Sequence, residues 1–214
     1  MQMIEIKNVT KKFGNNTETA LRGINLSIRS SQIVGIIGHN GSGKTVLMKC
    51  ICGFLPIDSG EISVCGKRIG KDIDFPDNIG IIIETPGFLP NFSGFNNLWQ
   101  LAKIRGKISK DDVRSVMKTV GLDPDEKKHV GKYSLGMRQR LGIAQAIMEN
   151  PGILMLDEPM NGLDKDGVND MRELLLKLKA DGKTIIVASH NSVDIDVLCD
   201  KVFEITKGNL KQVS

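Results

Sequence analysis

The segment Gly38-His39-Asn40-Gly41-Ser42-Gly43-Lys44-Thr45 is the most informative motif of this chain for its fold. It fits the pattern G-x-x-x-x-G-K-[ST], and it lies between an apolar run, Ile33 to Ile37, and a predicted helix, Val46 to Cys52. Glycines let backbone N–H groups converge on phosphate oxygens, and the start of the helix adds a favourable dipole. The stretch therefore predicts a phosphate-binding loop. The weaker alternative is a glycine-rich turn that happens to precede a lysine.

Chemical roles follow for the two residues that end this loop. Lys44 can reach the β- and γ-phosphates of a nucleoside triphosphate, and the Thr45 hydroxyl can ligate Mg²⁺. Magnesium bound to a nucleotide also needs an acidic partner at the end of a neighbouring strand. In Ile153-Leu154-Met155-Leu156-Asp157-Glu158, Asp157 can hold the metal or its water, and Glu158 can polarise an attacking water. Alone, this acidic pair could equally be a solvated loop; beside the phosphate loop, it predicts a P-loop nucleoside triphosphatase.

The organisation of the chain favours an α/β fold. Apolar runs at Ile33 to Ile37, Ile153 to Asp157 and Thr184 to Ser189 suit buried parallel strands. Between the last two, apolar residues recur at helical spacing, which gives a strand, helix, strand unit. These residues are Val168, Met171, Leu174, Leu175 and Leu178. The first 32 residues and Glu61 to Ile69 are expected to be β-rich, with turns at Gly14-Asn15-Asn16 and Gly66.

The middle of the chain has a helical pattern. Two apolar stripes at helical spacing are Phe95, Leu98 and Ala102, and then Val113, Val116, Met117 and Val120. The second begins at Ser109, with Asp112 three residues later as a capping box, and is expected to stop at Gly121. We therefore predict a helical subdomain, residues about 88–133, inserted into a single domain of residues 1–214.

Composition limits the other possibilities. The chain has 214 residues, 40% hydrophobic and 25% charged, and a net charge of +4 that is scattered along it, so nucleic acid is not an expected partner. Apolar runs such as Ile79 to Ile83 fall far short of the roughly 20 residues that cross a bilayer, and the N-terminus does not resemble a signal peptide. We expect a cytoplasmic protein. Its four cysteines have no CxxC spacing and are expected to be reduced and partly buried.

Further motifs identify a family resemblance that covers nearly the whole chain. The segment Tyr133-Ser134-Leu135-Gly136-Met137-Arg138-Gln139-Arg140-Leu141 resembles the signature sequence of ATP-binding cassette (ABC) proteins. Glu84 falls at the family's Q-loop and Asn161-Gly162-Leu163-Asp164 at its D-loop. Ser189-His190 falls at its switch histidine, and Phe13 falls where the family stacks an aromatic ring on adenine. The resemblance implies an ABC ATPase fold: a P-loop core with a parallel sheet, an N-terminal antiparallel β subdomain and the inserted helices.

The resemblance also implies roles and partners. Two cassettes would face head to tail, with ATP and Mg²⁺ held by residues 38–45 of one, and Ser134 and Gly136 of the other touching the γ-phosphate. Glu158 would be the general base, and His190 would hold the γ-phosphate and the attacking water. For an isolated residue, His190 would be read as a strand-end histidine with a satisfied hydrogen bond, and Phe13 could equally be a core aromatic. A separate transmembrane permease would be the partner, with this chain on the inner face of the membrane.

The sequence departs from the family pattern at two places. The signature LSGGQ is Tyr133-Ser134-Leu135-Gly136-Met137 here, which keeps Ser134 and Gly136. Glu84 stands where the family has glutamine, and its carboxylate should tighten metal binding and oppose the γ-phosphate, or pair with a basic group of the partner. Our hypothesis is that Glu84 tunes coupling to the membrane subunit; alternatively, it only caps the strand Ile79 to Ile83.

Glutamate at this position resembles the ATPases of exporters that protect bacteria against bacitracin-like and lantibiotic peptides. Export of an antimicrobial peptide or another hydrophobic compound is therefore the expected function. The alternative is a soluble, non-transport ABC ATPase acting on nucleic acid or ribosomes. In the family, the segment after the Q-loop receives a helix of the membrane subunit, although a core-packing role for most of its apolar residues is at least as plausible. These residues are Phe88, Leu89, Phe92, Phe95 and Trp99.

Overall fold

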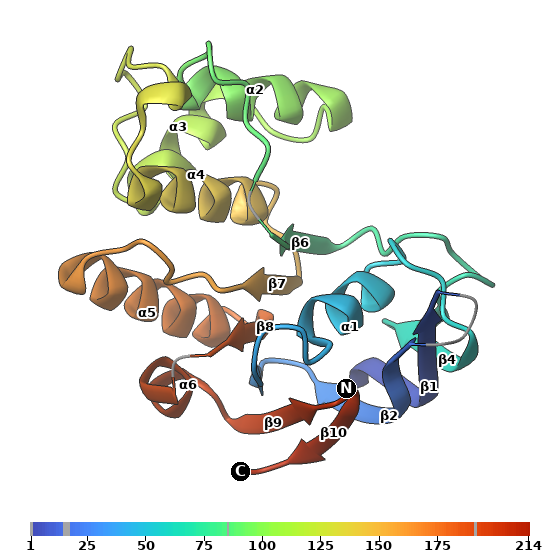
Figure 1. Cartoon of the computed structure of the whole chain (residues 1–214). Helices are drawn as coiled ribbons and strands as arrows, with labels where there is room; N and C mark the ends of the chain where they lie inside the picture. The colour runs from blue at the N-terminus through green and yellow to red at the C-terminus, as the bar shows by residue number, and fades with distance from the viewer. Residues whose placement is uncertain (1, 15–17, 85, 191) are drawn as a thin grey trace.

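A mostly parallel sheet forms the centre of the computed structural model, which describes residues 2–14, 18–84, 86–190 and 192–214 (Figure 1). Within the described residues, the order of its strands is β10-β9-β3-β8-β7-β6, and every neighbouring pair is parallel except β9 with β10. The strands are β3 Ile33–Ile37, β6 Ile79–Ile82, β7 Ile153–Asp157, β8 Thr184–Ser189, β9 Lys201–Thr206 and β10 Asn209–Gln212. The three predicted parallel strands are confirmed, each with its predicted bounds.

Strands β3, β7 and β8 at the centre of this sheet are buried on both faces, which explains why each is a nearly continuous apolar run rather than an alternating one. Leu154 and Leu156 of β7 pack into one hydrophobic cluster, and Ile153 and Met155 pack into the other. Helix α1, Lys44–Ile51, lies in the second cluster. Helices α5, Lys165–Ala180, and α6, Ser192–Leu198, cover the first. The predicted stripe of α5 is confirmed, because Met171, Leu174 and Leu175 are buried and Val168 and Leu178 pack against them.

A second, antiparallel sheet packs on the other side of α1, with strand order β2-β1-β4-β5. Its strands are β1 Gln2–Phe13, β2 Glu18–Arg29, β4 Ser59–Val64 and β5 Lys67–Arg68. Alternating residues of β1 such as Ile4 and Ile6 are buried with α1 in one cluster. The expected N-terminal β subdomain and the turn at Gly66 are thereby confirmed. Of the other predicted turn, Gly14 is a turn residue, and Asn15 and Asn16 lie outside the described residues.

The helical region forms a separate lobe, in which α2, α3 and α4 lie together above the β6 edge of the central sheet (Figure 1). Its elements are α2 Gly94–Arg105, α3 Lys110–Thr119, the short 3-10 helix η1 Val130–Lys132 and α4 Leu135–Ile147. The capping box of α3 is confirmed: Ser109 Oγ accepts from the Asp112 N–H at 3.2 Å, and the Asp112 carboxylate accepts from the Ser109 N–H at 2.8 Å. Helix α3 ends at Thr119, and the chain turns away from the helical direction at Gly121, whose φ of 73° is left-handed.

Helix α4 approaches β6 closely, and this contact joins the helical lobe to the sheet. A Cβ atom added at Gly80 of β6 would lie 1.9 Å from the carbonyl oxygen of Ala146 in α4. We therefore expect Gly80→Ala to lower the free energy of unfolding by about 1–3 kcal/mol, because α4 must shift away from the sheet. Gly87→Ala is the matched control, because a Cβ there meets nothing within 4 Å. Urea unfolding followed by circular dichroism measures both, and equal midpoints would contradict the prediction.

The cysteines differ in their surroundings. Burial raises the pKa of the Cys50 thiol to about 11 and that of Cys52 to about 12, so both are protonated at neutral pH. Cys199 is partly buried and Cys65 is exposed, and all four are free thiols.

No helix within the described part of the chain combines the length and apolar character that a membrane span requires.

Candidate active site

The loop between β3 and α1 is shaped by its glycines. Gly38 has φ 149° and Gly43 has φ 114°, a region of backbone conformation that favours glycine. An added Cβ at Gly38 would lie 2.4 Å from the Ile205 carbonyl oxygen, and one at Gly43 would lie 2.8 Å from that of Ala20. The loop therefore sits directly against the backbone of neighbouring strands, and side chains at these two positions would push it out of place. Helix α1 begins at Lys44, two residues earlier than predicted.

Two polar side chains of the loop have surroundings that suit a phosphate group. The buried Lys44 ammonium donates to the carbonyl oxygens of Gly38 at 2.6 Å and His39 at 3.3 Å. The hydroxyl oxygen of Ser42 is buried and has no hydrogen-bond partner within the described residues. A buried hydroxyl without a partner costs free energy unless a ligand satisfies it. The loop thus offers a donor, a cation and a helix N-terminus to an anion.

A cavity of about 830 Å³ opens over this loop. Along one side lie Phe13, Glu18 and Arg22 from the antiparallel sheet, and along the other lie Asp157 and Glu158 from the end of β7. Phe13 is 38% exposed and stands on the cavity wall, with the Lys11 ammonium 5.3 Å from its ring centroid. The ring is therefore not a core aromatic, and its exposed part is available to a base bound in the cavity. The cavity has the dimensions of a small-molecule site.

Asp157 and Thr45 meet as the sequence predicts for a metal site. The Thr45 hydroxyl donates to Asp157 Oδ2 at 2.9 Å. Burial raises the pKa of the Asp157 carboxyl, the Thr45 hydrogen bond acts against that rise, and the charge of Glu158 adds to it. A cation next to Asp157 would relieve this cost of burying a negative charge. These two side chains therefore fit a hard cation that prefers oxygen ligands.

Glu158 and His190 form the second polar pair of the site. His190 Nδ1 lies 2.7 Å from Glu158 Oε1, and the Ser189 hydroxyl donates to Glu158 Oε2 at 3.4 Å. Glu158 has φ 50°, and its N–H donates to the Ala188 carbonyl of the adjacent strand β8 at 2.8 Å. The carboxylate is thus held at the cavity wall from two neighbouring strands. His190 is absent from the residues that line the cavity, and it contacts the site through Glu158.

Ser134 and Gly136 lie elsewhere on the same chain. Both line a second cavity of about 510 Å³ between the start of α4 and the D-loop, which also includes Gly162 and Asp164. The Ser134 hydroxyl caps α4 by accepting from the Met137 N–H at 3.1 Å. Neither residue lines the cavity over the phosphate loop. Leu135, Arg138 and Gln139 of the same segment do line that cavity, so one copy of the chain brings part of its signature segment near its own phosphate loop but not Ser134 and Gly136.

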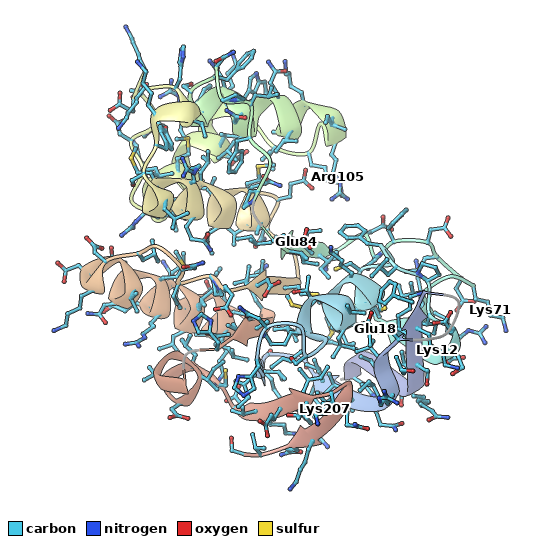
Figure 2. All side chains as sticks on the ribbon, viewed as in Figure 1. Lys12, Glu18, Lys71, Glu84, Arg105 and Lys207 are labelled. Atoms are coloured by element: carbon cyan, nitrogen blue, oxygen red, sulfur yellow. The ribbon has the colours of Figure 1, made fainter. Side chains whose placement is uncertain are left out.

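Glu84 follows β6 at the junction between the helical lobe and α1, as Figure 2 shows. It lines the cavity, but its Oε1 accepts from the Lys49 ammonium at 2.6 Å rather than pointing at Asp157 or Thr45. The sequence predicts that Glu84 acts on the metal and the γ-phosphate or pairs with a basic group of the partner, and it gives no direct indication of Lys49 in the same chain. The available signal was spacing, because Lys49 follows Thr45 by one helical turn.

Gln139 was also missed. It is buried in α4, and its side-chain amide donates to the Glu158 carbonyl oxygen at 3.1 Å, which links the signature helix to the residue after β7.

The apolar residues after Glu84 divide into two groups. Leu89 and Phe92 are 51% and 41% exposed. The other three, Phe88, Phe95 and Trp99, pack against the core.

The fold and this site together define a class of protein. The loop residues 39–44 line the cavity, the Thr45 hydroxyl bonds to Asp157 beside them, and Glu158 follows Asp157 directly at the end of β7. That combination, with strands β3 and β7 on either side of β8, is the arrangement of a P-loop nucleoside triphosphatase.

Comparison with known proteins narrows the class to a family. Residues 21–161 match the family model described as ABC transporter, and the chain belongs to this family of ATP-binding proteins. The ABC transporter ATP-binding protein YybJ of Bacillus subtilis is 43% identical to this chain, over 98% of this chain and 95% of that protein. It is 40% identical to the bacitracin transport ATP-binding protein BcrA of Enterococcus faecalis, over 97% of this chain and 68% of that protein.

Two further matches agree with these. The lantibiotic transport ATP-binding protein SrtF of Streptococcus pyogenes is 34% identical, over 97% of this chain and 89% of that protein. A solved dimeric structure of MJ0796, a bacterial ABC transporter cassette, superposes with a TM-score of 0.87 at 26% identity, over 99% of both chains. The predicted ABC ATPase fold and the resemblance to bacitracin and lantibiotic transport ATPases are confirmed.

Proposed function

We propose that this chain binds ATP with Mg²⁺, hydrolyses it, and thereby powers export through a separate transmembrane permease. The observation that carries the proposal is the set of polar residues that line one cavity, namely Ser42, Lys44, Thr45, Asp157 and Glu158. Its support from relatives is the 40% identity to a bacitracin transport ATP-binding protein. The exported molecule would be an antimicrobial peptide or another hydrophobic compound, and the chain would lie on the inner face of the cell membrane.

Two residues would hold the metal. Thr45 and Asp157 supply oxygen atoms, and among the described residues no group of three or more His, Cys, Asp or Glu side chains is placed to bind a metal without help. The remaining ligands would come from phosphate oxygens and water, with the Glu84 carboxylate of the same cavity as a further ligand once it leaves Lys49, so the cation and the nucleotide are expected to bind together. When bound, Mg²⁺ neutralises charge on the β- and γ-phosphates.

The residues around Glu158 would carry out the proton transfer. Glu158 would accept a proton from the water that attacks the γ-phosphate, while Lys44 and the loop amides stabilise the negative charge. His190, 2.7 Å from the same carboxylate, would fix its orientation and reach the γ-phosphate when the site closes. Phe13 would stack on adenine.

A second cassette would complete the site. Ser134 and Gly136 lie at the N-terminus of the 13-residue helix α4, which favours an anion, yet they line a different cavity from Lys44. A head-to-tail pair, of two copies or of this chain with a related one, would place them over the partner's nucleotide. Residues 1–214 would act as one ABC domain, with a helical subdomain of about 88–133. The exposed Leu89 and Phe92 would contact the permease.

The test is to tag the chain in its own cell, solubilise the membranes in mild detergent, and identify copurifying proteins by mass spectrometry. We expect a polytopic membrane protein in stoichiometric amount, and loss of that cell's resistance to a peptide antibiotic when the chain is deleted. Recovery only from the soluble fraction, with ribosomal proteins or nucleic acid, would favour the non-transport alternative, which the relatives do not support.

A further inference from the structure

The ion pair between Lys49 and Glu84 is a feature that the proposed reaction does not use. Its nitrogen and oxygen lie 2.6 Å apart, and the side chains are 29% and 64% exposed. Glu84 has a left-handed backbone with φ 63°, an uncommon conformation for a residue other than glycine. Such a conformation persists where the surrounding contacts hold it, and the pair with Lys49 is one of these contacts.

Lys49 stands beside the residues that would bind the metal. It follows Thr45 by four residues in α1, so the two side chains lie on one face of the helix. Thr45 in turn donates to Asp157. Glu84 lines the same cavity as Thr45 and Asp157, so its carboxylate lies near the position of a cation bound to these two residues. Lys49 holds that carboxylate by the ion pair.

The charges around the metal position show what Lys49 contributes. The carboxylates of Asp157, Glu158 and Glu84 all line the cavity, and of the two nearby lysines Lys44 binds loop carbonyls. A glutamine at position 84 would add no charge, whereas glutamate adds a third negative charge. Lys49 offsets that charge, so the pair has the same net charge as a glutamine alone.

We propose that Lys49 is a positioning residue for Glu84: it holds the Glu84 carboxylate against α1 in the nucleotide-free protein and competes with the nucleotide-bound Mg²⁺ for it. The inference rests on the proposed Mg²⁺ site and goes beyond it by naming what restrains Glu84. When the nucleotide binds, the Glu84 carboxylate leaves the Lys49 ammonium for Mg²⁺. This exchange costs little free energy because an exposed ion pair is weak.

A change in the metal dependence of ATP binding is the expected consequence. Without Lys49, Glu84 adds an uncompensated negative charge near the metal position, which favours ATP with Mg²⁺ and disfavours ATP alone. The readout is the ratio of the ATP dissociation constant in EDTA to that in excess Mg²⁺, measured by calorimetry. Lys49→Met should raise this ratio about two- to fivefold, the range that loss of an exposed ion pair gives. Lys49→Arg, which keeps the cation, should restore the parent value.

Combining both changes separates the proposed role from a merely structural one. Glu84→Gln should lower the ratio, and Lys49→Met combined with Glu84→Gln should match Glu84→Gln alone, because Lys49 acts through Glu84. An unchanged ratio in Lys49→Met would overturn the inference, as would a rise that survives in the double variant. Thermal unfolding of each variant confirms its folding, and Lys49→Gln repeats the test if Lys49→Met does not fold.

One more variant distinguishes failure of this inference from failure of the proposed function. Asp157→Asn should remove most of the effect of Mg²⁺ on ATP affinity if Thr45 and Asp157 hold the metal. If it does so while Lys49→Met leaves the ratio unchanged, the metal site stands and only the role of Lys49 is wrong. If Mg²⁺ makes no difference to ATP affinity in the parent protein, both proposals are wrong.

Discussion

Replacing Glu158 by glutamine is expected to lower the rate of ATP hydrolysis by about 10²–10⁴-fold, the contribution of a well-placed general base. Glutamine keeps the size of the side chain and an oxygen that can accept from His190 Nδ1, now 2.7 Å from the carboxylate. It cannot take a proton from water. Binding of ATP should change little, because Lys44, Ser42 and Thr45 are untouched.

The same variant should also trap a complex. If ATP binding closes a pair of cassettes and hydrolysis reopens it, a protein that binds without hydrolysing accumulates in the closed form. Gel filtration with ATP and Mg²⁺ should then show a dimer that the parent protein populates less. Glu173→Gln, which removes an equal charge from the exposed side of α5, is the control and should behave like the parent. Unaltered hydrolysis by a monomeric Glu158→Gln protein would show that another group is the base.

His190 and Glu158 should act as a unit in this reaction. Because the imidazole contacts the carboxylate directly, His190→Ala should slow hydrolysis strongly, and adding it to Glu158→Gln should cost little more. Steady-state rates of the two single variants and the double variant measure this. If the fold-decrease in hydrolysis rate of the double variant equalled the product of the two single fold-decreases, His190 would act on the phosphate independently of Glu158.

Some features of this structure could be predicted from the sequence because they depend on local pattern. The strands Ile33–Ile37, Ile153–Asp157 and Thr184–Ser189 are mostly apolar because elements cover both faces of the sheet, and this pattern is visible without a structure. The capping box at Ser109 is likewise local. The start of α1 was misplaced by two residues because the left-handed Gly43 lets the helix begin at Lys44.

Other features depend on contacts between distant segments, and these the sequence could not supply. Glu84 and Lys49 are 35 positions apart, and they meet only because β6 ends beside α1. Gln139 reaches the Glu158 carbonyl because the fold places α4 beside the residue that follows β7. Phe13 could be read as either a core or a site aromatic until its exposure was known. Residue type and order identified the chemistry, whereas the pairing of side chains required the fold.

Replacing Lys44 by methionine is expected to weaken ATP binding roughly 10- to 100-fold, the effect of losing a charge-assisted hydrogen bond to phosphate. Methionine matches the lysine side chain in length as far as Cε and lacks the ammonium group. In the nucleotide-free protein this ammonium is buried and binds two backbone carbonyls, of Gly38 and His39. Calorimetric titration with ATP measures the loss of affinity, and Lys103→Met on the exposed surface of α2 controls for the change in net charge.

Lys44→Met should move two measured quantities in opposite directions, and this separates a ligand-binding role from a structural one. Burying an ammonium against neutral carbonyls costs desolvation that methionine does not pay, so the nucleotide-free variant should unfold at the same temperature as the parent or higher. The rise in unfolding temperature on adding ATP should shrink, because each tenfold loss of affinity removes about 1.4 kcal/mol of ligand-induced stability, or about 3–6 °C at this chain length. A variant that is unstable without ATP but gains as much from ATP as the parent would mean that Lys44 supports the loop rather than the nucleotide.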